Sequence, residues 1–344
     1  MSSVVALKEK LSQSEIPWRA MLFVIAIFAL LLTGYVASMT GWSNFSLAPS
    51  DLIGYWFSFD ENNMTHQILE TLRAPRAYAG LMIGACLAVA GLLMQGLTRN
   101  ALASPSILGI NAGAACFMAF AAIGVPIISE INPIVNAVLG ALLSGVAVMM
   151  LGGFFSARSH PLRLVLAGIA ISALLLGLTR AALILADDMA YSVLHWLTGS
   201  LASVDKQQWN QLCLPALVGL VVAMGLARNL NLLALGEDVA VGLGSNVRRT
   251  RLITGITIVL LAGTCVAIAG PIGFIGLLVP HLVRPIVGHN YHVLIPCSAL
   301  TGAALVVWSD ALSRAIAFPT ETPVGVLTAL IGTPCFILVA MRSS

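Results

Sequence analysis

The side chains that could do chemistry are few in this sequence and widely scattered. Six cysteines lie far apart in or beside apolar stretches, and none forms a C-x-x-C pair, so packing explains them better than disulfides or metal ligation. His281, His289 and His292 have no carboxylate companion at ligand spacing, so they do not predict an iron site. The sequence has no G-x-x-x-x-G-K-[ST] phosphate loop and no nucleophile elbow. We therefore expect no enzymatic activity, no bound metal and no cofactor.

A polar, glycine-rich island interrupts the otherwise apolar second half of the chain, LNLLALGEDVAVGLGSNVRRTR at residues 230–251. Glu237 and Asp238 come early in a short predicted helix, where negative charge suits the helix dipole. Gly242 and Gly244 follow, and glycine commonly ends a helix. The island is longer than the turn that two membrane helices need. We interpret it as a rigid helix pair that contacts a cytosolic partner; a solvated loop whose acids only cap a helix is the alternative.

The elements that must position these residues are membrane helices. The 344 residues are 59% hydrophobic and 9% charged, whereas soluble domains carry about 25% charged residues. A membrane-spanning helix needs about 20 apolar residues, and about ten stretches meet or approach this length. We predict an all-α polytopic membrane protein with about ten transmembrane helices in a single domain, residues 1–344. The expected cores are Arg19–Met39, Ala77–Leu97, Ile107–Ile123, Ile134–Phe155, Leu164–Ala186, Trp209–Leu226, Leu252–Ala269, Ile275–Val287, Leu294–Phe318 and Val324–Met341.

The distribution of basic residues predicts the orientation, because Lys and Arg accumulate in cytoplasmic loops. With ten spans and both termini in the cytoplasm, twelve of the seventeen Lys and Arg lie inside, and most acids lie outside. The net charge of +3 is too small to predict nucleic-acid binding. We expect a multi-pass protein of a bacterial inner membrane. The basic residues predicted inside are Lys8, Lys10, Arg19, Arg99, Arg158, Arg163, Arg228, Arg248, Arg249, Arg251, Arg284 and Arg342, and those predicted outside are Arg73, Arg76, Arg180, Lys206 and Arg314.

Four stretches together carry a family resemblance. The first covers residues 72–115, beginning LRAPRAYAG and containing TRNALASP, and the second is WLTGSLA at residues 196–202. The third is the polar island. The fourth runs from AGPIGFIGLLVPHLVRP at residues 269–285 to DALSRAIAFPTETPVG at residues 310–325. In this order and spacing, from about Leu72 to Met341, they resemble the FecCD family, the permease subunits of iron–siderophore and cobalamin ABC importers.

The resemblance implies a type II ABC importer permease. Such a subunit pairs with a second permease, identical or homologous, and two cytosolic ABC ATPases dock underneath. A periplasmic or lipid-anchored substrate-binding protein delivers the metal chelate from outside. The expected function is therefore transport of a ferric siderophore across the inner membrane into the cytoplasm, by a permease surrounded by membrane lipid. The permease itself would catalyse no reaction. Iron would travel inside its chelator, so the permease needs no metal ligands.

The resemblance also implies roles for particular residues. The coupling segment, residues 230–247, would contact the ATPase through Leu235, Gly236, Glu237, Asp238, Gly242 and Gly244. Arg73 and Arg314 would form ion pairs with carboxylates of the binding protein, since a guanidinium binds a carboxylate bidentately. Asn100 and Leu102 would line the cytoplasmic gate, although Ala101 stands where the family commonly has proline. The neighbouring gate loop SHPLR, residues 159–163, does not match the hydroxyl-rich version of the cobalamin importer.

Each of these assignments has a simpler structural alternative. Arg73 could extend along the membrane to reach the interface. Arg314 could pair with Asp310, four residues earlier on the same helix face, because an ionisable group at that depth needs a partner. Asn100 could be only a helix cap. We expect GPIGF, residues 270–274, at the outer face, and a pathway lined by the second span, the fifth span and the segment near Gly270.

Three other functions are considered. A haem or cobalamin importer of the same family would share these motifs. An ion-coupled secondary transporter would need intramembrane acids that bind a proton or sodium, and Asp310 is the candidate. A membrane-embedded enzyme would need a catalytic constellation, which the sequence does not contain. The particular chelate and the identity of the second permease are not predicted.

Overall fold

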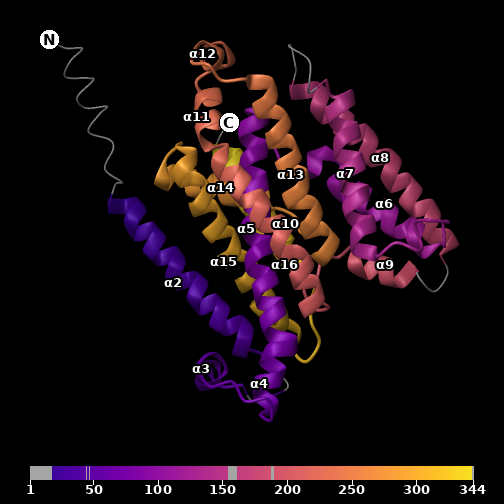
Figure 1. Cartoon of the computed structure of the whole chain (residues 1–344), viewed down its shortest axis with the longest axis vertical. Coiled ribbons are helices and arrows are strands. Elements are labelled where there is room, and N and C mark those ends of the chain that lie inside the picture. The colour runs from indigo at the N-terminus through magenta and orange to yellow at the C-terminus, as the bar shows by residue number, and fades with distance from the viewer. Residues whose placement is uncertain (1–17, 44, 46, 154–160, 187–189, 343–344) are drawn as a thin grey trace.

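The structure is a computed structural model that describes residues 18–43, 45, 47–153, 161–186 and 190–342. Within these ranges every regular element is a helix (Figure 1). Lys8, Lys10, Arg158, Ser159 and His160, which entered the charge count or the predicted gate loop, lie outside the described residues.

The predicted ten-span, all-α fold is confirmed. In the described part of the chain, seven helices are long and apolar enough to cross a membrane, and three shorter apolar helices complete the set of ten expected segments. The seven are α2 (Trp18–Thr40), α5 (Ala74–Thr98), α7 (Pro133–Leu151), α8 (Pro161–Leu185), α10 (Lys206–Gly225), α13 (Val247–Ala269) and α15 (Tyr291–Ala317). The three are α6 (Ile110–Ala122), α14 (Ile275–Val287) and α16 (Val324–Arg342).

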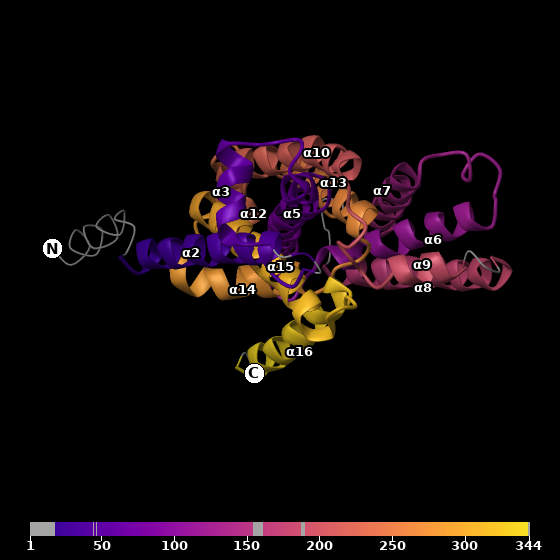
Figure 2. The same ribbon diagram turned by 90° about the horizontal axis from the view of Figure 1, so that it is seen from below.

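Helix α5 forms the centre of the bundle. It packs against α10, α13, α14 and α15, and 83% of the residues in its most apolar stretch are buried. Helix α2 lies on one side of α5, and α6, α7, α8 and the short α9 (Ala190–Trp196) lie together on the other side (Figure 2). Only 17% of the residues in the most apolar stretch of α8 are buried. Its exposed leucines and isoleucines can therefore contact lipid or another subunit.

Two glycine contacts set the distance between α5 and its neighbours. A Cβ atom on Gly84 would overlap the backbone of Gly302 in α15, and one on Gly91 would overlap the backbone of Gly276 in α14. Small residues allow this close approach of helices in lipid, where no hydrophobic force drives association. The spacing of glycines in α5 therefore positions both α14 and α15.

Short helices mark the two ends of the bundle (Figure 1). At one end, called the α3 end, lie α3 (Pro49–Phe57), α4 (Met64–Ile68) and a π-helical turn, η2 (Leu69–Arg73), that leads into α5. At the other, called the α12 end, α11 (Ala227–Ala234) and α12 (Glu237–Gly242) form a hairpin. A 3-10 turn, η3 (Pro105–Leu108), joins α5 to α6.

Aromatic side chains gather at the α3 end. Tyr78 stacks on Tyr35 with ring centroids 6.2 Å apart and contacts Trp209 at 5.6 Å. Tyr55 donates a short hydrogen bond to Glu70, which also pairs with Lys206 at 2.7 Å. Burial and the Glu70 carboxylate raise the pKa of Tyr55, so its hydroxyl stays a donor at neutral pH. Such aromatic belts are typical of a membrane–water interface.

Candidate functional site

A cavity of about 300 Å³ opens at the α3 end of the bundle. Its wall contains three arginines and one glutamate, contributed by η2, α5, α15 and the loop before α16. These are Arg73, Arg76, Arg314 and Glu321. The rest of the wall includes Trp42, Phe45 and the loop between α9 and α10. Asp205 also lines the cavity, and Arg76 and Arg314 are paired with acidic residues, so Arg73 is the cavity arginine that an acidic partner could pair with.

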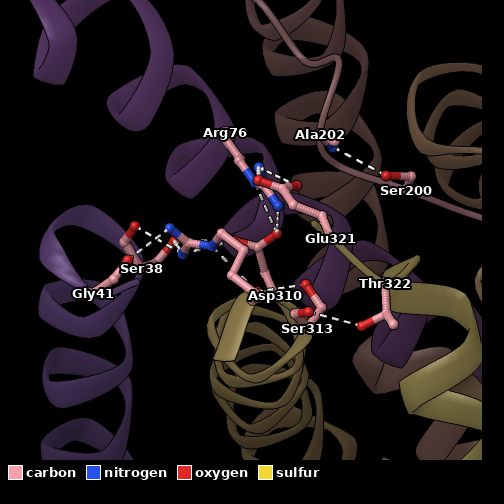
Figure 3. A network of polar contacts seen from close by, with 10 residues as sticks. Ser38, Gly41, Arg76, Ser200, Ala202, Asp310, Ser313, Glu321 and Thr322 are labelled. Carbon is pink, nitrogen blue, oxygen red and sulfur yellow. Dashed lines mark hydrogen bonds and ion pairs between the residues drawn. The ribbon is translucent and has the colours of Figure 1, made fainter. Parts of the chain in front are cut away.

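A buried ionic network lies beneath this cavity (Figure 3). Arg76 of α5 contacts the Asp310 carboxylate at 2.8 Å and the Glu321 carboxylate at 2.8 Å. Arg314 contacts the other Asp310 oxygen at 3.2 Å, and the Ser38 hydroxyl donates to the same oxygen at 3.2 Å. A buried ion that loses its partner costs about 3–5 kcal/mol, so the network holds α2, α5 and α15 together.

Arg314 is an internal residue in this structure. Its side chain is 1% exposed, and its guanidinium donates to the backbone carbonyls of Ser38 at 2.9 Å and Gly41 at 3.2 Å. The intrahelical pair with Asp310, the simpler alternative for Arg314, is present. Contact of Arg314 with a binding protein stays a prediction, and it would require these hydrogen bonds to exchange partners.

Arg73 is placed differently from Arg314. It is half-buried in the cavity wall and makes no hydrogen bond or ion pair with any other residue that the structure describes. The π-helical turn η2 widens the backbone just before α5 and separates Arg73 from the Arg76 network. Arg73 is thus the arginine of this cavity whose guanidinium is available for a new contact.

The hairpin at the α12 end brings together all six predicted coupling residues. Gly236 joins α11 to α12 with a φ of 122°, and Gly244 follows α12 with a φ of 81°, conformations that favour glycine. Apolar side chains project from this hairpin into solvent. Leu235 is 65% exposed, Val241 61% and Leu243 60%. An exposed apolar patch on a rigid element is typical of a protein interface.

Glu237 and Arg251 pair with each other. The Arg251 guanidinium bonds the Glu237 carboxylate, and its side chain is only 12% exposed. Arg99, at the end of α5, lies 3.9 Å from the same carboxylate and donates to the Leu233 carbonyl at 3.1 Å. The hairpin is therefore tied to α5 and α13, and Asp238 remains its exposed acid.

The predicted gate residues follow α5 immediately. Arg99 ends the helix in a left-handed conformation with a φ of 51°, and the Asn100 side chain accepts from the Leu102 amide at 2.9 Å. This Asx turn redirects the chain toward η3, so Asn100 shapes the turn after the cap, while Leu102 is 43% exposed. Their role in gating stays a prediction. Both lie next to Arg99 and hence next to the hairpin.

We expected the GPIGF segment at the outer face; it connects α13 to α14, and Gly270 contacts Trp196, which ends α9, and Gly199, which lies between α9 and α10. The Cys265 thiol donates to the Ile83 carbonyl at 3.9 Å, and Gly276 packs against Leu87 and Gly91. Residues 270–274 therefore run beside the middle of α5 without helical structure. They line a cavity of about 230 Å³ with Ser104, Ser106 and Asn111. Non-helical backbone is tolerated at membrane depth where it lines such a cavity.

Sequence reasoning missed Arg76, Arg99 and Arg251 as structural partners. Arg76 had a usable signal, since it begins an apolar span and Asp310 is the acid within another span. Arg99 and Arg251 had none, because their partners lie 134 and 14 residues away in the short helices α11 and α12. Among the described residues, no cluster of three His, Cys, Asp or Glu could hold a metal.

The fold and these sites define a polytopic α-helical membrane protein. Residues 22–342 match the profile of the FecCD transport family. The chain is 39% identical to the Fe(3+)-citrate import system permease protein YfmD of Bacillus subtilis (strain 168), over 94% of this chain and 95% of that protein. It is 44% identical to the Fe(3+) dicitrate transport system permease protein FecC of Escherichia coli (strain K12), over 80% and 83%.

A solved structure has the same fold over most of this chain. It is described as an inward-facing conformation of a putative metal-chelate type ABC transporter, with a TM-score of 0.79, 28% identity, and coverage of 94% of this chain and 99% of that one. The chain belongs to the FecCD transport family. It is a multi-pass permease subunit of the inner membrane.

Proposed function

We propose that this permease moves a ferric siderophore or a related iron chelate inward across the membrane, driven by two cytosolic ABC ATPases. The observation that carries the proposal is the separation of two contact surfaces. A cavity with Arg73, unpaired among the described residues, in its wall occupies the α3 end, and an exposed apolar hairpin occupies the α12 end. Relatives named for Fe(3+)-citrate, hydroxamate and enterobactin transport support the chelate class. Residues 1–344 act as one transmembrane domain.

Orientation follows from the charges at the two ends. The α12 end carries Arg228, Arg248 and Arg249 as exposed residues, so the positive-inside rule puts it in the cytosol. Both chain termini are then cytoplasmic, and the cavity with Arg73 faces the outside. The second permease subunit, identical or homologous, packs against the lipid-accessible helices, and the chelate passes between the two subunits.

The ATPase docks on the hairpin through Leu235, Gly236 and Asp238 and through the exposed face of α12. Because Arg99 and Arg251 tie Glu237 to α5 and α13, movement of the hairpin pulls on the end of α5. The gate residues Asn100 and Leu102 follow directly after Arg99. ATP binding thus moves the gate through a short, rigid connection.

Single cysteines test this arrangement. In a chain whose half-buried Cys213 and Cys335 are replaced by serine, Asp238→Cys should cross-link to the ATPase because it lies on the docking face. Asp238→Cys and Leu102→Cys should react with a membrane-impermeant thiol reagent only from the cytoplasmic side. The matched control is Thr320→Cys, which is exposed at the α3 end and should react only from outside. If Asp238→Cys stays unlinked in an active transporter, the docking assignment is wrong.

Arg73 binds a carboxylate of the substrate-binding protein. Its guanidinium has no ion pair or hydrogen bond within the described residues, unlike those of Arg76 and Arg314. Arg73→Glu should weaken binding of the substrate-binding protein by at least about tenfold, since a like-charge contact replaces a charge-assisted hydrogen bond. Titration of reconstituted transporter with labelled binding protein measures this. Arg180→Glu, the same change at an exposed residue of α8, should leave the affinity unchanged, and equal losses would contradict the assignment.

An ion-coupled mechanism has less support. Asp310 was the candidate acid for proton or sodium binding. Its oxygens accept from two arginines and a serine, which leaves no site for a cation. No feature of the described residues favours haem or cobalamin over an iron chelate.

A further inference from the structure

A groove of about 480 Å³ lies at the α12 end, beside the base of the hairpin, and Gly244 of the coupling segment forms part of its wall. It is bounded by the end of α10, the start of α11 and the first turn of α13. Its polar wall consists of Asn229, Ser245, Asn246, Arg249 and Thr250. No acidic residue lines it. The groove thus presents a cation and several hydrogen-bonding groups without a counter-ion.

Two hydroxyls of the groove have no partner. Thr250 is 2% exposed, and its hydroxyl makes no hydrogen bond to the described residues. Elsewhere in α13, the hydroxyls of Thr254, Thr257 and Thr264 all donate to the carbonyl four residues earlier. The Ser245 hydroxyl oxygen is also buried without a partner. Buried polar groups normally find a partner, and the Ser245 oxygen has none among the described residues. The unbonded Thr250 hydroxyl lies in the groove wall, and together the two point to a ligand that the protein does not supply.

The charge of the groove is positive and uncompensated. Arg249 is exposed, and its guanidinium forms no ion pair or hydrogen bond with described residues. The first turn of α13 adds the positive end of a 23-residue helix. Asn246 caps only the Arg249 amide, at 3.0 Å. A helix N-terminus combined with an arginine and hydroxyls is suited to a phosphate group.

The wall changes from polar to apolar along the helices. Val222 of α10 and Ile253 of α13 close the groove toward the middle of the bundle. Beyond them, Val221 is 70% exposed and Ile256 is 53% exposed. A polar site at the ends of two membrane helices, continued by an exposed apolar surface, matches the shape of a phospholipid with its headgroup at the interface.

We propose that this groove binds the phosphate of an anionic phospholipid. Arg249 and the Thr250 and Ser245 hydroxyls hold the phosphate oxygens, and the acyl chains lie along α10 and α13. Because the groove adjoins the start of α13, which also holds Glu237 through Arg251, a bound lipid fixes the base of the hairpin. The proposal does not depend on the substrate that the permease carries.

Native mass spectrometry of the purified full chain in detergent tests the site with phosphatidylglycerol as the probe. Arg249→Gln and Thr250→Val should each lower its binding constant by about tenfold, because a hydrogen bond to a charged group contributes roughly that factor. Arg248→Gln is the matched control, since Arg248 is exposed on the same turn but does not line the groove. Thr250→Ser keeps the hydroxyl and should keep the affinity, which separates lipid binding from any effect on folding.

Three outcomes would overturn the proposal. The first is an equal loss in Arg248→Gln and Arg249→Gln, which would mean that only the overall surface charge matters. The second is phosphatidylcholine binding as tightly as phosphatidylglycerol. The third is displacement of phosphatidylglycerol by millimolar inorganic phosphate, which would identify the groove as a site for a free anion.

Discussion

Replacing Gly91 by alanine should prevent this chain from reaching a stable, monodisperse fold. The new Cβ would fall on the backbone of Gly276, and backbone cannot move aside as the end of a flexible side chain can. Helix α14 would have to move away from α5, carrying with it the GPIGF segment that lines the inner cavity. Overpacking of this kind costs about 1–3 kcal/mol, and we expect about 3 kcal/mol or more because backbone is displaced.

The measurement is thermal unfolding of the purified chain in detergent, together with the yield of monodisperse protein. Gly177→Ala provides the matched control, since Gly177 is also within a membrane helix but a Cβ there would meet nothing within 4 Å. That control should be neutral or slightly stabilising, since alanine favours helix more than glycine does. If both variants unfold at the temperature of the unmodified chain, the close crossing of α5 and α14 is absent.

The helices of this protein could be predicted from the sequence because each is specified locally. Length and hydropathy alone located all ten segments, including α14, whose 13 residues are short for a span. The intrahelical pair of Asp310 and Arg314 was also accessible, because four residues along a helix place two side chains on one face. The hairpin was predictable because Gly242 and Gly244 indicated a helix end and because the segment is polar.

The contacts between distant segments could not be predicted in the same way. Arg76 reaches Asp310 across 234 residues. Its place at the start of an apolar span indicates that it needs a partner, but that pattern does not identify the partner. Arg76 is buried in the network, and Arg73, three residues earlier, has no partner among the described residues because the π-helical turn η2 lies before α5. The neighbours of GPIGF were also not predictable, since Gly270 contacts Trp196 and Gly199, which lie in a distant part of the chain.

The central claim is that this chain moves an iron chelate only when ATPases act on its hairpin. Uptake of a radiolabelled iron chelate into proteoliposomes tests it most directly, with the second permease present, the binding protein outside and ATP inside. We predict uptake that falls to background when the ATPase or ATP is omitted and that a proton or sodium gradient cannot replace. Uptake that persists without the ATPase and follows an ion gradient would contradict the account.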